Sequence, residues 1–464
     1  MTTPIVPPQQ LVERALALSK ADGCVVIADE GSSANLRWAN NTLTTNGVMR
    51  SRSVTVIAML DGGTGMASGS VSRSAVSADD LEPLVRWAEQ AALDNGPADD
   101  AQPLIEGDAA ADWDEAPAET TIGVFSELAP ALGAAFDRAR SDDRVLYGFV
   151  EHDVGTSYLG TSTGRRFRHV QPAGHIGITG KSADLSRSAW VGKSTRDFSD
   201  VDVQELGGEL KRRLDWAERS VELPAGRYDT VLPPDAVADL MIYAYWTMGA
   251  RDALDGRTVY SRPGGGTRIG DRFSARPVTL RSDPAAPGLE CGRRVIAHAS
   301  SSTSSVFDNG LPVGPTDWIR RGELTALIQT RRSAALTGQP TTPGVGNLIM
   351  AVDGAAGSTD DLVAGVERGL LLTCLWYIRA VDPQTLLLTG LTRDGVYLVE
   401  NGEVVGAVNN FRFNESPIDL LDRFSTAGAV APAHSREWGD YFPRSAMPPL
   451  RIPDFNMSTV TQAS

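Results

Sequence analysis

The sequence is poor in the residues that most often bind metals or act as nucleophiles. Its 464 residues include three cysteines, five histidines and four lysines. The cysteines, Cys24, Cys291 and Cys374, lie far apart and form no CxxC pair. This predicts no disulfide framework and fits a reducing compartment. No histidine pairs with another histidine or a cysteine at metal-ligand spacing, so local spacing alone indicates no metal site.

A long hydrophobic run is also missing. The longest, Leu370–Ile378, is far shorter than the about 20 residues that span a bilayer. Met1–Gln10 has neither the basic nor the apolar region of a signal peptide. We therefore expect a cytoplasmic protein without a membrane partner.

Acidic residues outnumber basic ones, 58 against 43, so the formal net charge is −15. Binding to nucleic-acid phosphates needs a positive face. The balance of charge therefore argues against nucleic acid as the main partner.

The chain is long enough for two or three domains with proper cores. Its clearest boundary is residues 96–120, which hold eight acidic residues and no basic residue. This composition predicts an acidic surface linker. We predict an N-terminal domain over 1–95, a middle domain over 121–222 and a C-terminal domain over 223–464.

Runs of strands beside separate helices favour an α+β fold over a wound parallel sheet. We expect an N-terminal α/β domain, a strand-rich middle segment with helices, and a C-terminal domain of mostly antiparallel strands around a buried helix. The clearest hairpin signal is 395–408, where Asn401-Gly402 joins two apolar runs. The strands expected in the first half are short: Cys24–Ala28, Asn35–Trp38, Thr42–Val48, Val54–Leu60, Val145–Glu151, Thr156–Thr161, Arg166–Val170 and His175–Thr179.

Residues 233–254 predict the central helix. Its stretch from Leu240 to Met248 leaves almost no polar face, so we expect burial almost all the way round, Trp246 included. The helix has no His, Cys, Glu or Lys. We therefore expect it to offer no metal ligand and no group that takes up a proton at neutral pH.

Two short motifs match catalytic patterns only in part. Residues 160–164 read GxSxG around Ser162, but the residues that follow alternate like a strand rather than opening a helix, which indicates a hairpin turn. Residues 174–182 resemble a phosphate loop, yet His175 stands where that pattern needs glycine. We expect a Ser/Gly turn between strands there.

A glycine-rich loop over 262–270 is a candidate part of a substrate cavity. Three successive glycines permit close backbone approach to a ligand or to another strand. A mobile or tightly turned loop is the alternative, since most loops carry no function. The candidate cavity residues are Arg262, Gly264, Gly265, Gly266 and Thr267.

Several longer segments, in order along nearly the whole chain, resemble the TldD/TldE (PmbA) family, two-subunit peptidases once called modulators of DNA gyrase. A hairpin similar to the family's "IENGE…PV" segment is the strongest match. The segments include SVTVIAMLDGGTGMASGS (53–70), PAGRYDTVLPPDAVADLM (224–241), LVAGVERGLLLT (362–373) and GVYLVENGEVVGAVNNFRF (395–413).

The resemblance implies where a metal would be bound in TldD-type chains. These carry HExxxH on the helix after the VVL strand and a cysteine near the C-terminus. The corresponding positions here are Ile242, Thr247 and Ser435. All three ligands and the general base are missing, so the chain is similar to the TldE-type subunit. We expect it to contain neither a catalytic residue nor a metal.

The resemblance further implies a heterodimeric metallopeptidase that degrades or processes unfolded or short peptides in an enclosed cavity. A TldD-type partner subunit would hold zinc or a similar divalent metal. Two alternatives stay open: a serine hydrolase that uses Ser162 with His298 or His434, and a non-enzymatic peptide-binding protein.

Overall fold

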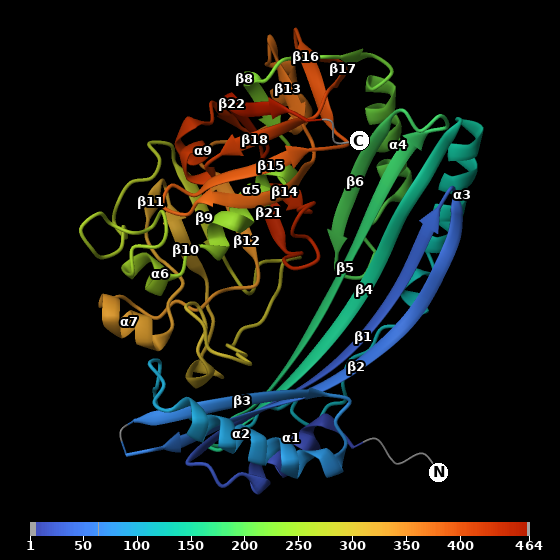
Figure 1. Ribbon diagram of the computed structural model, residues 1–464. Coiled ribbons are helices and arrows are strands. Elements are labelled where there is room, and N and C mark those ends of the chain that lie inside the picture. The colour runs from blue at the N-terminus through green and yellow to red at the C-terminus, as the bar shows by residue number, and fades with distance from the viewer. Residues whose placement is uncertain (1–5, 64, 462–464) are drawn as a thin grey trace.

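The first half of the chain forms one long antiparallel sheet in a computed structural model, which describes residues 6–63 and 65–461. The strand order is β3-β2-β1-β4-β5-β6. β2 alone has 20 residues, a length of about 65 Å, and Figure 1 shows the sheet curving past the C-terminal half. The strands are β1 (Gly23–Ala39), β2 (Thr42–Asp61), β3 (Met66–Ser74), β4 (Arg144–Thr161), β5 (Arg166–Ser182) and β6 (Ser188–Thr195).

Helices cover one face of this sheet. Even-numbered residues of β1, such as Val26 and Leu36, pack against them, while odd-numbered Val25 and Ile27 face the C-terminal half. The alternation follows from the two-residue period of a strand. The helices are α1 (Pro8–Leu18), η1 (Ala78–Asp80), α2 (Leu81–Asn95), η2 (Ile122–Phe125), α3 (Leu128–Ser141) and α4 (Val203–Trp216).

The second half contains two further sheets that share one core with helix α5 (Pro234–Trp246). The smaller sheet has the order β11-β10-β9-β12-β21-β20. Its strands are β9 (Val278–Ser282), β10 (Thr316–Arg320), β11 (Glu323–Leu324), β12 (Leu348–Val352), β20 (Ala431–Ala433) and β21 (Ser445–Met447).

The larger sheet follows the path β14-β15-β18-β22-β8-β13-β16-β17-β7, with β19 beside β22. Its strands are β7 (Ser220–Val221), β8 (Gly226–Leu232), β13 (Arg368–Leu372), β14 (Leu375–Asp382), β15 (Leu387–Thr392), β16 (Val396–Glu400), β17 (Glu403–Val408), β18 (Phe411–Glu415), β19 (Thr426–Ala427) and β22 (Leu450–Val460). Short helices complete this half: α6 (Ala250–Leu254), η3 (Val306–Asp308), α7 (Arg331–Thr337), α8 (Thr359–Ala364) and α9 (Pro417–Arg423).

The α+β class predicted from the sequence is confirmed, and so is the hairpin over 395–408. β16 and β17 pair antiparallel around Asn401 and Gly402, whose φ values of 52° and 82° fit a tight hairpin turn. Strands from both predicted domains, 1–95 and 121–222, join in the same six-stranded sheet. In the described part of the chain, no helix is long and apolar enough to cross a membrane.

The prediction of short strands in the first half is wrong. Cys24–Ala28 and Asn35–Trp38 are parts of one strand, β1, and Arg166–Val170 and His175–Thr179 are parts of another, β5. The predicted breaks fall at Gly, Ser and Asn, which favour turns locally. Within the sheet, however, Gly31 pairs with Ser51 on one side and Gly155 on the other. Backbone pairing on both sides outweighs the weak local preference.

Candidate functional site

Helix α5 is buried along its middle but not at its end. Leu240, Ile242 and Ala244 are at most 1 % exposed, whereas Trp246 is 38 % exposed. The prediction that Trp246 is buried is therefore wrong. The Trp246 ring lies edge-on to that of Trp438, with 5.2 Å between centroids. The helix ends at Trp246, and its last turn reaches the surface of the C-terminal half.

Two carboxyl groups in the first turns of α5 anchor the segment 434–446. Asp235 Oδ1 accepts a hydrogen bond from the backbone N–H of His434 (2.7 Å). Asp239 Oδ1 accepts one from the Ser435 hydroxyl (2.5 Å) and one from the backbone N–H of Glu437 (3.0 Å). These contacts attach the segment to the central helix.

Burial raises the pKa of Asp235 to about 6 and the pKa of Asp239 well above its ordinary value. The expectation that α5 has no group able to take up a proton near neutral pH is therefore wrong. One signal for this was present in the sequence: two aspartates stand one turn apart in an otherwise apolar helix. Their partners lie nearly 200 residues away, so local sequence could not reveal the contacts.

His434 attaches the same segment to the long sheet. Its Nδ1 lies 2.7 Å from the Ser194 hydroxyl of β6, and its ring stacks on those of His175 and Trp190. Burial lowers the pKa of His434 to about 3, so the ring is neutral at physiological pH. The segment therefore bridges the two halves of the molecule through an uncharged imidazole.

A second junction lies at the other end of the sheet. Phe307 in η3 packs against Val25 and Ile27, and His298 Nε2 lies 2.8 Å from Asp29 Oδ2. That hydrogen bond raises the pKa of His298. The loop around residues 296–307 thus docks on the sheet face that carries no helices.

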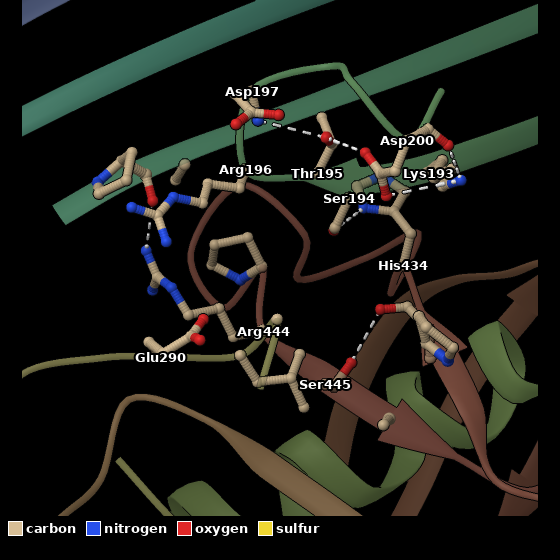
Figure 2. Close-up of a pocket in the computed structure, with 18 of the residues that line it drawn as sticks. Lys193, Ser194, Thr195, Arg196, Asp197, Asp200, Glu290, His434, Arg444 and Ser445 are labelled. Carbon is tan, nitrogen blue, oxygen red and sulfur yellow. Dashed lines mark hydrogen bonds and ion pairs between the residues drawn. The ribbon is translucent and has the colours of Figure 1, made fainter. Parts of the chain in front are cut away.

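A cavity of about 1330 Å³ lies along the edge of the long sheet, against the C-terminal half. Its walls come from β5, β6 and the start of α4 on one side, and from residues 287–293, 430–434 and 443–446 on the other. Figure 2 shows residues 193–197 of the sheet edge opposite Glu290, Arg444 and Ser445. Both halves of the molecule therefore line one cavity.

Charged groups in this cavity are unevenly distributed. Near α4, carboxylates pair with cations: Lys193 with Asp200 at 3.6 Å and Arg213 with Glu209 at 2.7 Å. Arg196, Arg293 and Arg444 also line the cavity, and within residues 6–63 and 65–461 none of them forms an ion pair.

The candidate nucleophile Ser162 lies in the turn between β4 and β5, as predicted. Its Oγ accepts a hydrogen bond from the backbone N–H of Cys24 (3.0 Å). His298 and His434 instead bond to Asp29 and Ser194. Across the described residues, no hydrogen bond connects Ser162 to either histidine, so the structure does not bring this proposed set together.

The candidate cavity loop forms a tight turn elsewhere on the C-terminal half. Gly264, Gly265 and Gly266 all have positive φ, and Arg262 donates a hydrogen bond to Asp271 Oδ1 (2.5 Å). Neither Arg262 nor Thr267 lines the cavity described above. Their role in a substrate cavity stays a prediction.

Sequence comparison assigns the family. The profile of the PmbA/TldA metallopeptidase C-terminal domain matches residues 225–459, and that of PmbA/TldA metallopeptidase domain 1 matches residues 24–92. The chain belongs to the PmbA/TldD metallopeptidase family. No curated protein sequence matches it.

Solved structures of this family share the fold. TldE from Thermococcus kodakarensis has a TM-score of 0.76 at 15 % identity, over 97 % of this chain and 99 % of that one. A candidate modulator of DNA gyrase from Thermotoga maritima has a TM-score of 0.73 at 17 % identity, over 97 % and 99 %. Another from Bacteroides thetaiotaomicron has a TM-score of 0.73 at 15 % identity, over 98 % of both chains.

The positions that the PmbA/TldD resemblance assigns to metal ligands do not fit a metal here. Ile242 is fully buried in the core. The Thr247 hydroxyl donates to the backbone carbonyl of Ala244 (2.9 Å), and that of Ser435 donates to Asp239. Among the described residues, no group of three or more His, Cys, Asp or Glu side chains could hold a metal ion. A zinc site needs several nitrogen, sulfur or carboxylate ligands.

Proposed function

We propose that this chain is the peptide-binding, metal-free subunit of a two-subunit metallopeptidase. A TldD-type partner would contribute the HExxxH helix and a zinc or similar divalent ion, which supplies the activated water for peptide hydrolysis. This chain would bind and enclose unfolded or short peptides.

The observation that carries the proposal is the chemistry of Ile242, Thr247 and Ser435. An alkyl group and two hydroxyls engaged in internal hydrogen bonds stand where the family resemblance assigns two imidazoles and a thiolate. Loss of one ligand could be compensated by a neighbouring side chain. Loss of all three favours a division of labour between subunits.

The cavity supports a role in peptide binding. β6 is one of the two edge strands of the long sheet, and its residues 191–195 line the cavity. An edge strand offers backbone N–H and C=O groups to an extended peptide, which can add to the sheet as another strand. An unfolded or short peptide can take up this extended form along its length, so the geometry favours unfolded substrates.

The test combines this chain with a partner that carries HExxxH. We expect hydrolysis of a reduced, alkylated protein only when both chains are present, and we expect a chelator to abolish it. Changing the first His of the partner's motif to Ala should abolish activity, whereas Ser162→Ala in this chain should leave it unchanged. Hydrolysis by this chain alone would refute the proposal.

A further inference from the structure

The cavity contains a cationic end, centred on Arg444 in the segment between His434 and β21. The Arg444 side chain is half-buried, and burial lowers the pKa of its guanidinium. Among the described residues its side chain makes a single hydrogen bond, a long one of 3.4 Å, to the backbone carbonyl of Pro172. A charged group removed from water without a counter-charge is unfavourable. Arg444 is therefore a cation whose hydrogen-bonding capacity is largely unused.

Among the described residues, no ion pair neutralises Arg444. Burial lowers the pKa of His169 and raises that of Cys291, so both are uncharged near pH 7. Glu290 lies beside Arg444 in Figure 2. In the part of the chain that the structure describes, however, no ion pair joins Glu290 to Arg444.

Arg196 and Arg293 add positive charge at the same cavity, and both are exposed. Figure 2 shows the Arg196 side chain, from the loop after β6, pointing toward that of Arg444. Two guanidinium groups that converge repel one another unless an anion lies between them. The carboxylates near α4 cannot fill this role, because Asp200 and Glu209 already pair with Lys193 and Arg213.

We propose that the Arg444 end of the cavity, together with Arg196, binds a carboxylate group of the peptide. The inference rests on the proposed peptide-binding function and extends it to a preferred class of peptide. A guanidinium offers two parallel N–H donors that match the two oxygens of a carboxylate. The carboxylate is either the peptide's C-terminus or the side chain of an Asp or Glu.

The experiment titrates the intact chain with four acetylated pentapeptides by calorimetry. Acetyl-Ala-Leu-Ala-Leu-Ala is used as the free acid and as the amide, and acetyl-Ala-Leu-Glu-Leu-Ala-amide is compared with its Gln counterpart. We expect at least one carboxylate peptide to bind about tenfold more tightly than its neutral counterpart. The free-acid pair reports a C-terminal site, and the Glu pair reports a side-chain site.

Arg444→Gln should remove this preference, while Arg444→Lys should retain part of it. Arg196→Gln alters an exposed side chain and should weaken the same preference, so the test holds even if Arg444→Gln fails to fold. Arg138→Gln removes one exposed charge on α3, outside the cavity, and should change nothing.

Equal binding of acid and neutral peptides would overturn the carboxylate site and leave the proposed function standing. Absence of binding by all four peptides would overturn the site as well. The hydrolysis assay with the partner subunit would then decide separately whether the proposed function also fails.

Discussion

Replacing Asp235 by asparagine tests the electrostatics of the anchored segment. Asp235 lies in the first turn of α5 and accepts the backbone N–H of His434 through Oδ1. Asparagine has nearly the same shape and keeps a carbonyl oxygen for this N–H, but it does not ionise. The change therefore removes a half-buried charge with little loss of packing.

The magnitude follows from the pKa of Asp235, which burial raises from 3.8 to about 6. Because the pKa of Asp235 is higher in the folded chain than in the unfolded chain, its ionisation does not affect folding at a pH below the unfolded-state pKa. The folded chain then loses stability as the pH rises from there to about 6. Each pH unit corresponds to 1.36 kcal/mol, so about two units amount to about 3 kcal/mol. Allowing for an imperfectly placed amide group, we expect Asp235→Asn to be about 1–3 kcal/mol more stable than the native chain at pH 7.

Urea unfolding between pH 3.5 and 8, followed by tryptophan fluorescence, measures this difference. The gain should be present at pH 7 and nearly absent at pH 3.5. Asp184→Asn is the control of opposite sign, because hydrogen bonds from Ser182 and Ser186 lower the pKa of Asp184 to about 2. That variant should lose stability at pH 7. An Asp235→Asn chain that is destabilised at pH 7, or equally affected at both pH values, would refute the reasoning.

Two further predictions follow from burial and charge. Trp246→Ala should lower the free energy of unfolding in urea by about 1–3 kcal/mol, because Trp246 is 38 % exposed. This is less than the about 3–5 kcal/mol expected for a buried tryptophan. The fully buried Trp318 is the control, and an equal loss for Trp318→Ala would contradict the argument. The hydrogen bond to Asp29 raises the pKa of His298. The pair therefore contributes its full stabilisation to the fold below the ordinary histidine pKa of about 6.5, and this stabilisation is lost as the pH rises through the folded-state pKa. His298→Asn should therefore lower the melting temperature more at pH 6 than at pH 8.5, and equal shifts would exclude a charged pair.

Sequence patterns predicted those elements whose signals are local. The hairpin at Asn401-Gly402 needs only two residues with positive φ. Helix α8 has a signal of the same local kind, because the hydroxyl of its N-cap residue, Ser358, accepts a hydrogen bond from the backbone N–H of Asp361. In both cases the residues that determine the structure are neighbours in the chain.

The remaining features depend on distant partners. The length of β5 follows from its pairing with β4 along its whole course and with β6 from Gly174 to Lys181, which outweighs Gly174 and Gly177. Arg444 is one of many arginines in the sequence, and its position in the cavity arises only when residues 443–446 lie opposite β5. Neither property can be obtained from a window of adjacent residues.

Hydrogen bonds hold residues 434–446 against α5, although Ser435 offers a hydroxyl and not a metal ligand. A metal ion would link the segment to α5 through ligands from both. Here Asp235 accepts a hydrogen bond from the backbone N–H of His434. Asp239, one turn further along α5, accepts hydrogen bonds from the backbone N–H of Glu437 and from the Ser435 hydroxyl. The Trp438 indole N–H adds a bond to the backbone carbonyl of Asp239 (2.8 Å). Because His434 also bonds to Ser194 of β6, these contacts fix a wall of the cavity and hold Arg444 within it.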